Sequence, residues 1–136
     1  MNFDEFTGQV QHRLSLPGTG EAVRAIRATL TTLGERIQEG EATDLAGSLP
    51  MEIDYYVTDA VPEHGQRFDW TEFVGRVWER EGMEDRDDRA DAAYHARVVL
   101  DVVNEVVSPN EMRQIRDQLP ADDGWDELFD VIDQNA

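Results

Sequence analysis

The sequence predicts an all-α protein in which a unit of three to four helices occurs twice, packed as one helical bundle with pseudo-twofold symmetry. Three observations support this fold class. Apolar residues recur at helical spacing, segments of the first half align with segments of the second, and each half begins at a residue that can cap a helix. We therefore expect a single domain over residues 1–136, with a first helical repeat at 2–61, an inter-repeat linker at 62–67 and a second helical repeat at 68–134.

The internal repeat, a tandem duplication, is visible as two aligned blocks. Residues 2–14 align with 69–81 at an offset of 67, where five of 13 positions are identical. Residues 21–50 align with 91–120 at an offset of 70, where seven of 30 positions are identical. The change of offset falls in a loop, where insertions cost little. The identical pairs include Phe6/Phe73, Gly8/Gly75, Arg13/Arg80, Arg27/Arg97, Glu35/Glu105, Glu41/Glu111 and Pro50/Pro120.

The first helix of each copy is predicted by a capping-box pattern. Asn2 is followed three positions later by Glu5, and Asp69 is followed by Glu72 in the same way. Apolar residues of each segment then share one helical face. These faces consist of Phe3, Phe6 and Val10 in the first copy and Trp70, Phe73 and Val77 in the second.

The second helix of each copy carries an apolar stripe at alternating spacings of three and four. This spacing is typical of helices that pack at a shallow angle of about 20°. The stripes are Val23, Ile26, Leu30, Leu33 and Ile37 in the first copy and Ala93, Ala96, Leu100, Val103 and Val107 in the second.

A short third helix and a fourth apolar stretch complete each copy. The third helix begins at Gly40 in the first copy and at Ser108-Pro109-Asn110-Glu111 in the second. A Leu-Pro pair ends it in both copies. Residues 51–57 and 125–132 follow, and we expect both to form amphipathic helices. The Tyr-Tyr-Val-Thr run at 55–58 also suits a strand, so residues 51–60 have an extended alternative.

The composition indicates an unusual solvent environment. The chain has 30 acidic and 12 basic residues, a net charge of −18, and every basic residue is arginine. A lysine-free acidic surface suits a salt-rich, halophilic cytosol, because carboxylates hold water and added salt screens their mutual repulsion. A mimic of nucleic acid, or a surface that docks on a basic partner, is the alternative.

Several protein classes are excluded or disfavoured. The absence of cysteine excludes disulfide scaffolds, zinc–thiolate sites and cysteine nucleophiles. No apolar run approaches 20 residues and the chain opens Met-Asn-Phe-Asp-Glu, so we expect a soluble cytoplasmic protein without a membrane partner. No cluster of basic residues is present, and nucleic-acid binding is therefore disfavoured.

The run from Gly40 to Pro50, GEATDLAGSLP, follows a helix that ends in Leu33-Gly34-Glu35-Arg36-Ile37. Together with FDEF near the start and DWTEF before VGRVWERE, this run resembles the family known as domain of unknown function 2267. The resemblance covers nearly the whole chain and implies an all-helical bacterial or archaeal protein with two copies. In the second copy, Ser108-Pro109-Asn110-Glu111 replaces the Gly-Glu-Ala pattern typical of the family. The family supplies no catalytic residue.

One group of residues has metal-ligating types at helical spacing. Asp87, Asp91 and His95 are spaced four apart, so they share one helical face and are weak candidates for a metal site. Such triples arise easily in a chain this acidic, and the first copy has Ala25 where the second has His95. We expect His12 and His64 to be surface histidines.

Four residues are candidates for an interface. Gly8 and Gly75 recur on the outer side of their helices, where the two interpretations are simple solvent exposure and the close approach of another helix, from the other copy or from a second chain. Trp78 and Trp125 are aromatic side chains of the kind that anchor interfaces, with core packing as the simpler interpretation. For Arg13/Arg80 and Arg27/Arg97 we expect a structural role, binding helix-end carbonyls or the Glu35/Glu105 pair across the bundle.

These observations favour a non-enzymatic helical module that binds a protein partner or itself in a high-salt cytosol. The sequence has no nucleophile elbow and no phosphate-binding glycine loop, and we expect no catalytic residues and no cofactor. A small-molecule or metal-dependent enzyme with a carboxylate-lined cleft between the repeats is the alternative. A helix-turn-helix nucleic-acid binder is the weakest alternative.

Overall fold

The computed structural model describes all residues, 1–136, and contains helices but no strand, as the periodicity predicts. The first half contains α1 (Phe3–Arg13), α2 (Thr19–Arg36), α3 (Glu39–Ser48) and α4 (Ile53–Val57). The second half contains α5 (Trp70–Arg80), α6 (Asp88–Val106), α7 (Pro109–Asp117), the 3₁₀ turns η1 (Ala121–Asp123) and η2 (Trp125–Phe129), and α8 (Asp130–Asn135).

The helix starts follow from the capping residues. Asn2 accepts a hydrogen bond from the Glu5 amide at 2.8 Å, and the Glu5 carboxylate accepts one from the Asn2 amide at 3.2 Å, which completes the predicted capping box. Asp69 caps α5 in the same way, but the Glu72 carboxylate binds Arg76 instead of returning to the cap. Side-chain oxygens therefore satisfy amide groups that the first turns leave free.

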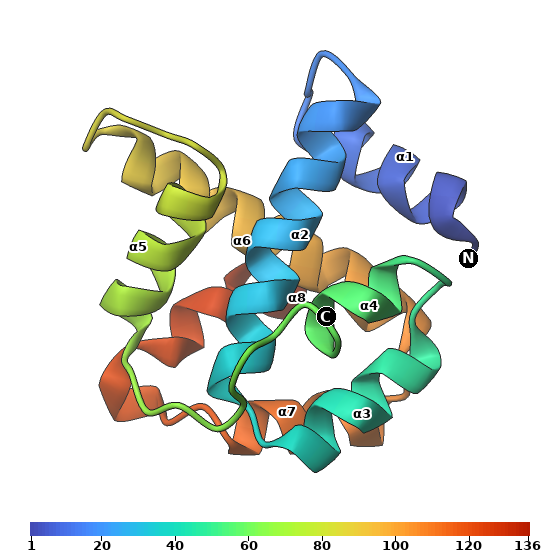
Figure 1. The fold of residues 1–136 in the computed structure, drawn as a ribbon, viewed down its shortest axis with the longest axis vertical. Coiled ribbons are helices and arrows are strands. Elements are labelled where there is room, and N and C mark those ends of the chain that lie inside the picture. The colour runs from blue at the N-terminus through green and yellow to red at the C-terminus, as the bar shows by residue number, and fades with distance from the viewer.

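The two long helices α2 and α6 contact each other in the middle of the molecule (Figure 1). Helix α1 packs against both α2 and α6, and α5 also packs against both. Helices α3 and α7 lie side by side at one end of the long helices, and α4 covers part of α2 (Figure 1). Each half therefore contributes its first helix to the packing of the other half.

The core is built from the predicted apolar stripes. The first helices bury Phe6, Val10, Phe73 and Val77, while α2 and α6 bury most of their three- and four-spaced positions. The largest fully buried side chains are Trp125, Phe6, Phe73, Phe129, Ile26, Leu30, Leu33, Ile37, Leu45, Ile53, Leu100 and Ile115. One continuous cluster joins both halves, so neither half has a core of its own.

The fourth element of each half shows where the sequence prediction holds and where it is wrong. Residues 53–57 are helical, so the extended alternative for this segment is wrong. The expectation of one amphipathic helix over 125–132 is also wrong, because the segment is a 3₁₀ turn followed by a short helix. Gly124, with a left-handed φ of 87°, separates this segment from η1, and the helical path is broken again at Phe129, where the 3₁₀ turn ends and α8 begins.

None of the helices combines the length and the apolar character that crossing a bilayer requires.

Candidate functional site

The structure does not assemble the candidate metal ligands. Asp87 and Asp91 are exposed, and no three His, Asp or Glu side chains in the chain are close enough to share an ion. The His95 Nδ1 atom instead faces the buried carboxylate of Glu81, at 2.8 and 3.1 Å from its two oxygens. This contact joins α6 to the end of α5.

The two recurring glycines lie in different surroundings. A Cβ atom at Gly8 would meet no other atom within 4 Å, so no helix approaches this position. A Cβ atom at Gly75 would lie 2.5 Å from the end of the Arg89 side chain. The close approach at Gly75 therefore comes from a flexible side chain at the start of α6 and not from a packed helix.

The two candidate tryptophans also differ. Trp78 is partly exposed, donates a hydrogen bond from Nε1 to the Asp85 carbonyl at 2.8 Å, and lies near the Arg89 guanidinium. Trp125 is fully buried and packs edge-on against Phe73 with ring centroids 5.2 Å apart. Trp125 is therefore part of the core, which is the simpler of the two interpretations that the sequence offered for it.

The recurring arginines join the two halves. Arg13 on α1 binds Asp101 at 2.8 Å and Glu105 at 2.7 Å on α6. Arg80 on α5 binds both carboxylate oxygens of Glu35 on α2, at 2.5 and 2.9 Å. The predicted ion pairs with Glu35 and Glu105 are therefore present. Arg97 binds the Glu127 carbonyl, while Arg27 is exposed and makes no hydrogen bond within the chain.

Carboxylates between the halves are thus engaged in structural pairs. Burial alone would raise the pKa of Glu35, but hydrogen bonds and charges from Arg80 and Arg76 outweigh burial and lower this pKa. A carboxylate held in its charged form by two guanidinium groups is a poor proton acceptor. This contact gives no support to general-base chemistry between the repeats.

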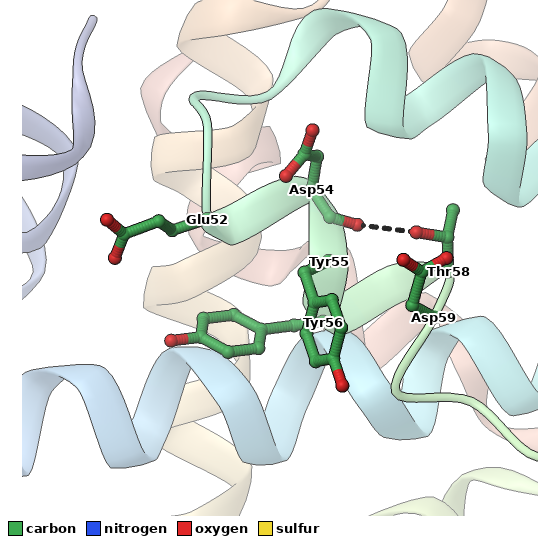
Figure 2. A pocket seen from close by; sticks show the side chains of 6 residues that line it. All are labelled: Glu52, Asp54, Tyr55, Tyr56, Thr58 and Asp59. Atoms are coloured by element: carbon green, nitrogen blue, oxygen red, sulfur yellow. Dashed lines mark hydrogen bonds between the residues drawn. The ribbon is translucent and has the colours of Figure 1, made fainter.

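An exposed patch on α4 has a different character. We call Met51, Glu52, Asp54, Tyr55, Tyr56 and Asp59 the α4 surface. Met51 is 82% exposed and Tyr55 is 52% exposed, although both side chains are large and apolar. The Tyr55 and Tyr56 rings meet edge to face with centroids 6.3 Å apart. A hollow of about 400 Å³ is lined by Thr58 and the members of this surface other than Met51 (Figure 2).

Local packing places these side chains outside. Ile53 and Val57, one helical turn apart, are fully buried and hold α4 against α2. Thr31 on α2 donates a hydrogen bond to the Tyr56 carbonyl at 3.0 Å, which fixes the middle of the segment. Because the helix is anchored by one face, Tyr55 is left on the opposite face. Glu52, just before the helix, has a φ of 78°, which is strained for a residue with a side chain.

The charged side chains that line the hollow of the α4 surface are all acidic. Glu52, Asp54 and Asp59 line the hollow and take part in no ion pair. A neighbouring hollow of about 590 Å³ shares Thr58 and Asp59 and adds the carboxylates of Glu39 and Glu63. Neither hollow is lined by an arginine. Exposed aromatic rings among unpaired carboxylates form a surface that suits a cationic group.

The sequence predictions did not identify this surface. The residues were expected to form a helix, and their aromatic side chains were assigned no role. One signal was present in the alignment of the two halves, because the offset of 70 pairs Tyr55 with Trp125 and Tyr56 with Asp126. The two halves therefore differ in sequence in this element, while the preceding Leu-Pro pair is common to both.

Comparison with known proteins identifies the family. No curated protein matches the chain. The family model described as uncharacterized conserved protein (DUF2267) matches residues 3–127, nearly the whole chain. The chain therefore belongs to the DUF2267 family.

Proposed function

We propose that this protein is a non-enzymatic docking module whose α4 surface binds a cationic segment of a partner protein. The observation that carries the proposal is the exposure of Met51 and Tyr55 on a surface with three unpaired carboxylates and no basic side chain. Apolar rings supply contact area, and the carboxylates select for arginine or lysine.

We also infer that the chain is a tandem duplication with pseudo-twofold packing, which explains why only one copy carries this surface. Residues 41–49 and 111–119 have the same order of buried, intermediate and exposed positions. The Arg13–Glu105 and Arg80–Glu35 pairs join equivalent positions in opposite directions between the copies. These features support descent of both halves from one unit.

The fourth element is then the place where the copies differ. Trp125 and Phe129 are buried in the second copy, whereas Tyr55 and Asp59, their partners at the offset of 70, are exposed in the first. An aromatic residue that is not needed for the core is available for binding. The α4 surface is therefore a feature added to the common fold and not a consequence of it.

The high net charge favours a salt-rich cytosol as the setting. At molar salt the Debye length is about 3 Å, so only charges in direct contact attract each other strongly. A partner would therefore need to place its cationic groups against the carboxylates and the rings. Such contact-range recognition fits a surface in which Tyr55 lies among Glu52, Asp54 and Asp59 (Figure 2).

A titration with a defined probe tests the proposal. The probe is a short synthetic peptide of alternating arginine and leucine, added to the full chain in molar KCl and followed by amide chemical shifts. We expect shift changes centred on residues 51–59, and a loss of affinity of about tenfold in Tyr55→Ser. Tyr94→Ser is the matched control, because Tyr94 is 48% exposed on α6 and lies outside the α4 surface.

Two outcomes would contradict the proposal. Equal weakening by Tyr55→Ser and Tyr94→Ser would mean that the peptide binds the acidic protein without using the α4 surface. A dimer in light scattering that Met51→Ser and Tyr55→Ser dissolve would mean that the surface binds a second copy of the chain. Circular dichroism establishes that each variant remains folded, as expected for exposed side chains.

A further inference from the structure

Arg36, the last residue of α2, is a buried cation without an acidic partner. The residue is only 5% exposed. Its Nε donates a hydrogen bond to the Phe68 carbonyl at 3.0 Å, and its guanidinium carbon lies 5.5 Å from the centre of the Trp125 ring. Arg36 takes part in no ion pair, although the chain has 30 acidic residues. Because buried charges are normally paired, this guanidinium lacks a counter-ion.

The two terminal nitrogens of Arg36, Nη1 and Nη2, are available for binding. The hydrogen bond from Nε to Phe68 is the only one that this side chain makes within the chain. Three side-chain polar atoms are both fully buried and without a hydrogen bond, namely Thr7 Oγ1, Thr29 Oγ1 and Trp125 Nε1. The terminal nitrogens of Arg36 are not among them, so they reach the surface. A buried cation therefore presents its unused N–H groups to solvent.

The surroundings of Arg36 add a second cation. Burial lowers the pKa of Arg36, the nearby charge of Arg67 lowers this pKa further, and Asp123 acts in the opposite direction. Arg67 is exposed and takes part in no ion pair. An anion bound between the two guanidinium groups would relieve their mutual repulsion and supply the missing counter-charge.

The helical fold itself does not require this arginine. Helices α2 and α6 end at equivalent positions, and at the offset of 70 the counterpart of Arg36 is Val106. The bond from Arg36 to Phe68 anchors the linker to α2, but it uses one N–H group and leaves the charge unpaired. The cation is therefore an addition to the first half, beyond what the helix end needs.

We propose that Arg36 and Arg67 bind an oxyanion, a carboxylate or a phosphate group, beside the end of α2. The planar Arg36 guanidinium matches two oxygen atoms of such a group, and Arg67 contacts the anion from the exposed side. Asp123 and the negative end of the helix dipole oppose binding. Direct hydrogen bonds must therefore hold the anion, and these persist in molar salt better than long-range attraction does. The site is independent of the α4 surface, which selects the opposite charge.

An exchange of anions at constant ionic strength tests the proposal. The full chain is kept in molar KCl, and chloride is replaced stepwise by acetate in one series and by phosphate in another. The chemical shifts of amide and side-chain N–H groups are followed. We expect saturating shifts of Arg36 Nε–H, of Trp125 Nε1–H and of the amides of residues 66–68. Tighter binding of acetate identifies a carboxylate site, and tighter binding of phosphate identifies a phosphate site.

Variants of exposed residues give the decisive readout. Arg67→Gln should weaken binding of the preferred anion about tenfold, because it removes a charged donor. Asp123→Asn should tighten binding by about twofold, because the opposing charge that it removes is already screened by molar salt. Arg27→Gln is the matched control. It removes an exposed arginine roughly 14 Å along α2 from Arg36 and should leave the affinity unchanged.

The Arg36→Lys variant tests the recognition geometry. Lysine keeps the charge but lacks the planar fork, so we expect binding to weaken about tenfold. Circular dichroism verifies folding, and Arg67→Gln remains decisive if Arg36→Lys unfolds. An absence of saturating shifts with both anions, an unchanged affinity in Arg67→Gln, or equal weakening by Arg27→Gln and Arg67→Gln would each overturn the proposal. Tyr55→Ser should not affect anion binding, so failure of this site is separable from failure of the α4 surface.

Discussion

Individual residues determine how closely the elements of this fold can approach each other. Gly34 is the clearest case, because a Cβ atom there would lie 2.7 Å from the Val57 carbonyl oxygen and 2.6 Å from the Val61 side chain. Backbone cannot give way as a flexible side chain can. The glycine in the last turn of α2 is therefore required by the packing of α4 and the linker, whereas Gly8 in α1 meets no such neighbour.

Alanine substitutions at these two glycines should change stability in opposite directions. Gly34→Ala should lower the free energy of unfolding by about 1–3 kcal/mol, because overpacking forces α4 away from α2. Gly8→Ala should raise it by about 1 kcal/mol, because alanine favours the helix and enters open space. Urea denaturation in molar KCl measures both. A neutral effect of Gly34→Ala would show that α4 is not held against α2 as described.

Two glutamates should show opposite pH dependences. Ion pairs with Arg80 and Arg76 lower the pKa of Glu35 in the folded state below the ordinary 4.5. The stability from this group is fully present above pH 4.5 and is lost as the pH falls through the lowered pKa. Burial and the charges of Asp44 and Glu111 raise the pKa of Glu41, so its ionised form costs stability above the raised pKa and this cost disappears toward pH 4.5.

The glutamine variants separate the two contributions. At neutral pH, Glu35→Gln should destabilise by about 1 kcal/mol, while Glu41→Gln should stabilise by roughly 0.5 kcal/mol. The Glu41→Gln difference should vanish as the pH approaches 4.5, and the Glu35→Gln difference only below that pH. Denaturation curves of both variants and the parent at matched pH give these differences. The same sign for both at neutral pH would contradict the assignment of their surroundings.

Elements with a strong local signal could be predicted from the sequence, and elements decided by tertiary contacts could not. Capping residues and apolar spacing predicted α1, α2, α5 and α6, because these signals lie within each helix. The fourth elements were harder. Residues 53–57 form a helix only as a short turn anchored on α2, and the left-handed Gly124 divides the segment that follows α7.

The candidate sites depend even more on tertiary contacts. The spacing of Asp87, Asp91 and His95 could not reveal that Glu81, at the end of another helix, faces His95. Tryptophan is a common anchor residue in interfaces, but contacts with Phe68, Trp70 and Phe73 place the Trp125 side chain in the core. The ion pairs of Arg13 and Arg80 were predicted more successfully, because each arginine and each partner glutamate occurs at a matching position in both halves of the chain.

The whole molecule balances few ion pairs against many free carboxylates. Only six of the 30 acidic side chains take part in ion pairs, and the pairs of Arg13 and Arg80 are partly shielded from solvent. Salt weakens attractions and repulsions alike, but it acts most on exposed charges. Added salt should therefore reduce the repulsion among the free carboxylates more than it weakens the ion pairs of Arg13 and Arg80.

The free energy of unfolding should consequently rise with KCl, and it should continue to rise toward molar salt because the remaining repulsion acts over short distances. Denaturation at a series of KCl concentrations measures this slope, and sucrose in place of KCl controls for solvent exclusion from the surface. The triple variant Glu52→Gln, Asp54→Asn and Asp59→Asn removes three unpaired carboxylates, so its slope should be shallower. A parent chain whose stability is independent of KCl would contradict a salt-rich setting, since repulsion within a chain of charge −18 would then be too weak to require screening.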